Sequence, residues 1–231
     1  CALPIFRGVP DVPGIVHKIF SRIAGEHIVV DMIVQNISVD GRTEVSFTVA
    51  ETDLQRTLLL AEEISRDIGA QGVDSCTTVS KVSIVGLGMR THTGVADRMF
   101  RTLAEKGINI HMITTSEIKI SVLVDRAQAA EALQAVHAEF QLDAPLPEYV
   151  ASPRYKMKDD DGRAEVSEER LRQIARDLPA MEDILVSGVD GVENQGLVTL
   201  HGVPDKPGIA AKIFERVAQA GVAVDLIVQN V

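Results

Sequence analysis

The fold is decided by a stretch that occurs twice in this 231-residue chain. Residues 8–37 read GVPDVPGIVHKIFSRIAGEHIVVDMIVQNI, and residues 202–231 read GVPDKPGIAAKIFERVAQAGVAVDLIVQNV, with 18 of 30 positions identical and no gap. A more distant copy, GMRTHTGVADRMFRTLAEKGINIHMI, occupies residues 88–113 and keeps the glycines, the phenylalanine and the apolar spacing. Self-similarity of this kind indicates one structural module repeated along the chain.

Each copy predicts a strand, a turn, a helix and a second strand. Apolar runs at residues 82–85 and 197–200 precede the turn and have the length and β-branched content of strands. Pro13 and Pro207 are expected as the first helical residues, because proline has no N–H to leave unpaired. Apolar side chains then recur at helical spacing and define one buried face per helix: Ile15, Ile19, Phe20 and Ile23; Val95, Met99, Phe100 and Leu103; Ile209, Ile213, Phe214 and Val217.

The rest of each module follows the same logic. The second strands, at residues 28–36, 108–115 and 222–230, are mostly apolar, so we expect them to be central or covered by helices. Asp40-Gly41 predicts a hairpin turn before a third strand, and residues 116–124 continue similarly in the second copy. Amphipathic helices at residues 53–68 and 127–140 close these modules. The order βαββαβ predicts an α+β, ferredoxin-like fold with antiparallel sheets and helices on one face.

The domain organisation follows from the repeats and from the break between them. We expect a first module at residues 1–78, a second at 79–140, a linker at 141–181, and the start of a further, truncated module at 182–231. The linker is rich in proline near its start and then carries an acidic run at residues 159–161, which is typical of an exposed connector. Within it, residues 167–178 predict a helix.

Composition excludes several classes of function. A formal net charge of −10 without a basic cluster argues against a nucleic-acid partner. The apolar runs fall far short of the roughly 20 residues that a membrane-spanning helix needs. Cys1 and Cys76 have no CxxC partner, so neither a zinc site nor a disulfide framework is indicated. We therefore expect a cytoplasmic protein with no metal, no cofactor and no membrane contact.

Four motifs carry a resemblance to a known family: GVPDKPGIAAKIF, VDMIVQNISVDGRTEVSFTV, KVSIVGLGMRTHTGVADRMF and GINIHMITTSEIKISVLV. They resemble the paired ACT domains of aspartate kinases, over nearly all of the chain outside the linker. In that family the pair follows an amino-acid kinase domain and binds lysine or threonine, which provides feedback control of lysine, threonine and methionine biosynthesis. Some bacterial members carry the pair twice, and the duplication resembles that arrangement. The resemblance implies regulation, with no catalytic residue in this chain and the kinase domain elsewhere in the full-length protein.

An amino-acid effector presents a carboxylate and an ammonium, and a helix start offers unpaired N–H groups with a partial positive charge. The sequence therefore predicts three kinds of contact: N–H donors at Gly14, Ile15, Gly208 and Ile209, carboxylates at Asp11 and Asp205, and amides at Gln35, Asn36, Gln229 and Asn230. The resemblance adds Met89, Thr91, Thr115, Ser116 and Glu117 in the second module. Val12 stands where the third copy has Lys206, and Thr93 replaces the proline, so the copies need not bind the same ligand.

Each feature also has a purely structural reading. Glycine turns before helices are common, and Asp11 can simply favour the helix N-terminus. Three functions remain: an allosteric amino-acid-binding module, an enzyme that cradles a phosphate, and an assembly element whose sheets join edge to edge without a ligand. The enzyme is disfavoured because the sequence has no GxxxxGK[ST] loop. Lysine and threonine both stay open as effectors, and so do pairing within one chain and a homodimer.

Overall fold

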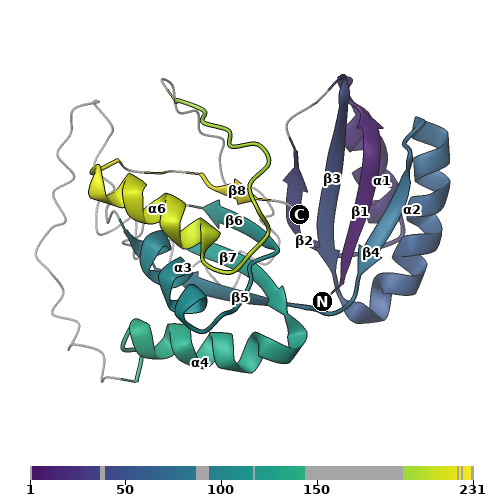
Figure 1. Cartoon of the computed structure of the whole chain (residues 1–231). Coiled ribbons are helices and arrows are strands. Elements are labelled where there is room, and N and C mark those ends of the chain that lie inside the picture. Colours follow the sequence, from purple (N-terminus) through teal and green to yellow (C-terminus); the bar gives the residue numbers. More distant parts are fainter. Residues whose placement is uncertain are drawn as a thin grey trace, which may run out of the picture. The chain divides into compact units, whose positions relative to one another are not determined.

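A computed structural model describes residues 2–36, 40–86, 94–116, 118–143, 195–222, 224 and 226–229. Every helix and strand named below lies in one compact unit, which is built from residues 1–145 and 202–231 (Figure 1). The expected helix at residues 167–178 and most of the expected linker fall outside the described residues.

The first module has the predicted order βαββαβ, and its antiparallel sheet has the strand order β2-β3-β1-β4 (Figure 1). Its elements are β1 (Leu3–Pro10), α1 (Ile15–Gly25), β2 (Val30–Gln35), β3 (Arg42–Val49), the short 3₁₀ turn η1 (Glu51–Asp53), α2 (Leu54–Ile68) and β4 (Gly72–Cys76). The hairpin turn predicted before β3 is present, with Asp40 and Gly41 both at positive φ.

Helix α1 begins two residues later than the proline signal predicts. Gly14 is the residue before the helix and has a φ of 85°, a left-handed conformation that cannot be part of a right-handed helix. The helix therefore starts at Ile15, and Pro13 belongs to the turn. Gly208 has the same conformation before Ile209, so the expectation that Pro13 and Pro207 are first helical residues is wrong.

The buried face of α1 is the predicted one. Ile15, Ile19 and Ile23 are buried, and they share a core with Phe6 and Phe47 of the sheet. Phe20 is half-buried and meets the ring of Phe47 at 5.3 Å between centroids. Burial of a side chain of this size contributes about 1.5–3 kcal/mol, so this apolar face does most to fix α1 on its sheet.

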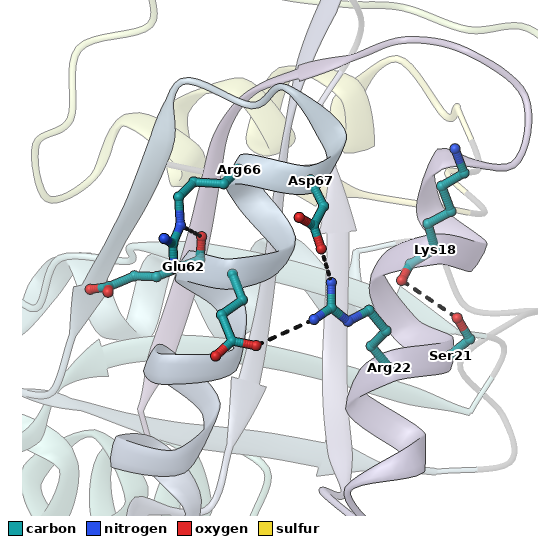
Figure 2. Close-up of polar contacts among 7 residues, drawn as sticks. Lys18, Ser21, Arg22, Glu62, Arg66 and Asp67 are labelled. Atoms are coloured by element: carbon teal, nitrogen blue, oxygen red, sulfur yellow. Dashed lines mark hydrogen bonds and ion pairs between the residues drawn. The ribbon is translucent and has the colours of Figure 1, made fainter.

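Arg22 links α1 to α2 at the surface (Figure 2). Its guanidinium donates to Asp67 and reaches Glu63 Oε2 at 3.4 Å. Exposed pairs of this type contribute about 0–1 kcal/mol, so they orient the helix pair more than they stabilise it.

The second module repeats the pattern up to its second helix. Its elements are β5 (Val79–Val85), α3 (Val95–Glu105), β6 (Met112–Ser116), β7 (Lys119–Asp125), the 3₁₀ turn η2 (Arg126–Gln128) and α4 (Ala129–Glu139). Met99, Phe100 and Leu103 of α3 are buried as predicted, while Val95 is only partly covered. Both described modules thus have an antiparallel sheet and a pair of helices, as the sequence predicts.

The third copy completes the second sheet. Its strand β8 (Val228–Gln229) pairs antiparallel with the outer edge of β6, in the register Ile113↔Gln229 and Thr114↔Val228, and the strand order becomes β5-β7-β6-β8. Its helix α6 (Ile209–Gln219) packs beside α3, where the rings of Phe100 and Phe214 lie 5.2 Å apart (Figure 1). Strands β6 and β8 are the counterparts of β2 in the second and third copies, so two equivalent strands from different copies pair here.

Two expectations about strands are wrong. Residues 197–200 form no strand, and Leu197 and Val198 are more than four-fifths exposed. In the first module the equivalent strand β1 takes its hydrogen bonds from β3 and β4, and these 231 residues contain no third-copy counterpart of that pair. The expectation that the second strands are central or covered by helices holds for β6, which lies between β7 and β8. It fails for β2 as a central strand, since β2 lies at the edge of its sheet and pairs only with β3 among the described strands.

The two sheets share a core of their own, which we call the inter-sheet core. It consists of Leu3, Met32, Val34, Val79, Met112 and Leu123, all of them buried. Two ion pairs accompany it, one between Lys81 and Asp31 and one between Arg126 and Glu51, the latter at 3.0 Å. The faces of the sheets that carry no helix therefore pack on one another through these side chains.

Substitution of Gly8 tests the packing of the first module. Its φ is +57°, and an added Cβ would collide with the side chain of Gln71, whereas Gly41 at φ +73° faces open space. We expect Gly8→Ala to lower the free energy of unfolding by about 1 kcal/mol more than Gly41→Ala, which adds only left-handed strain of about 1–2 kcal/mol. Urea unfolding of both variants measures the difference. Equal losses would show that Gln71 moves aside at no cost.

The pKa of Glu51 reports on the contact between the two modules. The hydrogen bond and the charge of Arg126 lower the pKa of the Glu51 carboxyl below 4.5. Because the pKa of Glu51 is lower in the folded state than in the unfolded state, the ionised carboxylate stabilises the fold above pH 4.5. This stabilisation is lost as the pH falls through the pKa of the folded state.

In an NMR titration, Arg126→Gln should return the pKa of Glu51 towards 4.5. The pKa of Glu26, which Arg56 lowers independently, should stay unchanged and serves as the control. A Glu51 pKa that does not respond to the substitution would contradict the ion pair.

Candidate effector-binding site

The helix-start turns have the same backbone in all three copies. Gly14, Gly94 and Gly208 have φ values of 85°, 92° and 87°. In two of the turns the next N–H is already used, since Ile15 donates to Val12 O at 3.2 Å and Ile209 donates to Lys206 O at 3.3 Å. The other N–H groups of the first helical turn have no acceptor within the helix, so each turn presents donors and a partial positive charge to an anion.

In the first copy the predicted residues lie at one end of the sheet. The N–H of Asp11, just after β1, donates to Gly41 O at 2.9 Å, and the N–H of Asn36, just after β2, donates to Glu44 O at 3.0 Å. Because β3 lies between β1 and β2, these two positions flank the start of the same strand. Gln35 ends β2 opposite Val45. The structure therefore brings this predicted set together at one end of the sheet, beside the start of α1.

In the third copy the predicted residues contact the second module. Asp205 Oδ1 accepts a hydrogen bond of 2.7 Å from Asn109 Nδ2, and Gln229 Nε2 donates to Ile110 O at 3.2 Å. A Cβ at Gly208 would lie 3.5 Å from Ala104 Cβ, so this turn faces the end of α3. The predicted carboxylate, helix start and amide all lie where the second and third copies join.

Thr115 contributes to that junction from the second module. Its Oγ1 accepts a hydrogen bond of 2.7 Å from the N–H of Ile227. Ser116 is exposed at the end of β6, and its hydroxyl makes a long contact of 3.5 Å with Lys119 O. The predicted residues Met89, Thr91, Glu117 and Asn230 lie outside the described part of the chain.

Asn109 is a site residue that the sequence analysis missed. It holds the Asp205 carboxylate, but it lies before β6 and outside the turn and strand-end motifs. A signal was available, because the aligned positions of the other two copies are Val29 and Ala223. A polar residue at a position that is otherwise apolar marks a specific contact.

Neither a metal site nor a membrane-spanning helix occurs among the described residues. No group of three or more His, Cys, Asp or Glu side chains there could hold a metal ion. Among the described helices, none combines the length and the apolar character that crossing a bilayer requires.

Comparisons with known proteins agree with the fold described above. ACT domain models match residues 5–69 and 82–140. An aspartate kinase from Pseudomonas fluorescens is 49% identical over 139 residues, which are 60% of this chain and 34% of that protein. The ligand-free regulatory subunit of aspartate kinase from Thermus thermophilus is 39% identical, with a TM-score of 0.56 over 60% of this chain and 92% of the subunit.

A further solved structure extends over the third copy. Aspartate kinase from Synechocystis aligns with 99% of this chain and 35% of its own length, at 25% identity and a TM-score of 0.71. The chain spans about a third of the length of the curated relatives that it matches.

Residues 5–69 and 82–140 are thus ACT domains, arranged in tandem. The chain belongs to the aspartate kinase family, and it corresponds to the regulatory ACT-domain region of those proteins.

The hydrogen bond between Asn109 and Asp205 can be tested by hydrogen exchange. We expect Asn109→Val, which installs the residue of the first copy, to speed exchange in α6 about fivefold, because an exposed hydrogen bond of this kind contributes roughly 1 kcal/mol. Asp205→Asn keeps an acceptor oxygen and should change exchange much less. Unchanged exchange in Asn109→Val would show that Phe214 and β8 hold the third copy without this bond.

Proposed function

We propose that this chain is the effector-binding part of an aspartate kinase, and that the effector is L-lysine, L-threonine or both. The proposal is supported by the membership in the aspartate kinase family together with the junction of the second and third copies. That junction joins a helix start, the Asp205 carboxylate and the Thr115 hydroxyl. It is the observation that carries the proposal.

The chemistry of an amino acid fits these groups. Its carboxylate takes the N–H donors at the start of α6, and its ammonium takes Asp205, exchanging the hydrogen bond from Asn109 for a charged partner. Gln229 offers an amide beside the same strands. In the first copy Asp11, Gly14, Gln35 and Asn36 form the equivalent set at the edge of β2.

Regulation follows from the two-sided construction of this site. Asp205 and Gln229 belong to the third copy, while Asn109 and Thr115 belong to the second. A ligand that contacts both copies binds their paired arrangement more tightly than the separated one. It stabilises the pairing by that difference in binding free energy. In the full-length protein this bias changes the activity of a kinase domain that phosphorylates L-aspartate with ATP, which constitutes feedback control of the pathway.

For the domain organisation we propose modules at residues 1–78, 79–140 and 182–231, with a linker at 141–181. The observed elements fit the first two ranges, since β4 ends at Cys76 and α4 ends at Glu139.

Isothermal titration of the purified chain with L-lysine and L-threonine tests the proposal, with L-aspartate as a control. Asp11→Asn and Asp205→Asn remove one negative charge at nearly constant shape, so each should weaken binding at its own copy about tenfold. Asp67→Asn changes an exposed carboxylate on α2 (Figure 2) and should leave the affinity unchanged. Heat that does not respond to either site variant would place the ligand elsewhere.

One observation favours a second function, which is assembly without a ligand. Strands β6 and β8 are the equivalents of β2 in the other two copies, and their pairing shows that strands of this kind can join edge to edge. Among the described strands, β2 has a neighbour only on its β3 side, so its outer edge can accept a strand from a second copy. A chain that binds none of the three amino acids but forms homodimers in sedimentation, at a level reduced by Ile33→Lys on β2, would support assembly alone.

A further inference from the structure

The face of the second sheet that carries no helix is divided into an apolar part and a polar part. Along β5, β7 and β6, alternate residues face away from α3 and α4. Leu123 and Met112 lie opposite one another in the inter-sheet core, and Lys81 of β5 lies opposite Leu123 in the same row. The next row in register is Ser83, Ser121 and Thr114, and beyond it Lys119 lies opposite Ser116. Three strands thus place a row of hydroxyls, and beyond it the Lys119 ammonium, beside Leu123 and Met112.

A cavity of about 230 Å³, largely open to solvent, lies at this boundary. One wall is Asp31, Met32 and Ile33 of β2, and the other is formed by Thr114, Thr115, Ser116, Lys119 and Ser121 of β6 and β7. The volume far exceeds the roughly 30 Å³ share of one water molecule, and it is below the ~300 Å³ at which pockets for drug-sized ligands begin. It suits a small organic molecule.

The charges in the cavity select an anion. The Asp31 carboxylate is already paired with Lys81, and none of the described carboxylates forms an ion pair with Lys119. Ser121 shares a hydrogen bond of 2.8 Å with Ser83. The groups that remain to meet a ligand are the Lys119 ammonium and the hydroxyls of Thr114 and Ser116.

We propose that this cavity binds a small aliphatic monocarboxylate, whose carboxylate contacts Lys119, Thr114 and Ser116 and whose alkyl part lies against Met32 and Ile33. One ammonium that no described carboxylate pairs with, together with hydroxyl donors, matches one negative charge. The paired Asp31 on the opposite wall disfavours a phosphate dianion and offers no free carboxylate for an ammonium group. The cavity therefore selects a ligand different from the amino-acid effector proposed above.

The cavity borders the effector site, because Thr115 lines the cavity and also accepts the hydrogen bond from Ile227 at the β6–β8 edge. Thr114 and Ser116 point to the side of the sheet that carries Met112, whereas Ile113 on the opposite side belongs to the core under α3 and α4. The effector site lies at the starts of the helices and at the β6–β8 edge. Because the cavity has one wall from each ACT domain, its ligand also links the two domains.

NMR titration of the whole chain with butyrate at constant ionic strength tests this site. We expect saturable shifts in the amides of Thr114, Ser116 and Lys119. Lys119→Met should raise the dissociation constant at least about tenfold, since it removes a charge-assisted hydrogen bond. Lys119→Arg should keep the affinity within a few-fold, which separates loss of charge from loss of fold.

The controls separate this site from others. Lys18→Met removes an exposed lysine on α1 (Figure 2), and it should leave butyrate binding unchanged, as should Asp11→Asn and Asp205→Asn. Butyramide, which lacks the charge, should not bind. Butyrate shifts that survive Lys119→Met, or inorganic phosphate that binds more tightly than butyrate, would overturn the proposal.

Discussion

Six apolar side chains between the two sheets are the contact on which the arrangement of the two ACT domains depends. Leu3, Met32 and Val34 from the first sheet meet Val79, Met112 and Leu123 from the second, and all six are buried. Each sheet has two faces, and its own helices cover only one of them. Without this core, both sheets would expose apolar side chains to water. The core also fixes β2 beside the uncovered face of β6 and β7, so the cavity lined by Lys119 exists only because the sheets pack here.

The helix-start turns show which parts of the fold a sequence can reveal. The duplication and the helical spacing correctly identify the modules and the buried face of each helix, because apolar periodicity is a local property of the chain. Proline was the wrong marker of the helix start, since the left-handed backbone at Gly14 decides where helical geometry can begin. The apolar run at residues 197–200 shows the complementary limit. It has the composition of a strand, but a strand also requires neighbours, and composition does not report them.

The candidate site was predictable to a similar extent. The turn and strand-end motifs point to Asp205 and Gln229, and the structure places both at a junction between copies. Asn109 was missed because its role depends on which copy pairs with which, and that choice is not encoded in any single motif. Comparison of the three copies position by position would have found it, since Val29 and Ala223 make Asn109 the exception. The position of β2 at an edge also depends on tertiary pairing, which explains why its apolar composition suggested a central strand.

The pairing of β8 with β6 has a consequence for how the chain folds. Thr115 and Ile227, which hydrogen-bond at this edge, are 112 residues apart in sequence, whereas the first sheet closes within residues 3–76. Contacts between distant residues form slowly, because the loop must close before they stabilise anything. Until then the edge of β6 is open to the nearer β2, whose sequence VDMIVQ differs from VDLIVQ of the third copy at a single position. The duplication that builds the paired sheet thus also gives the nascent chain a kinetic competitor for the same edge.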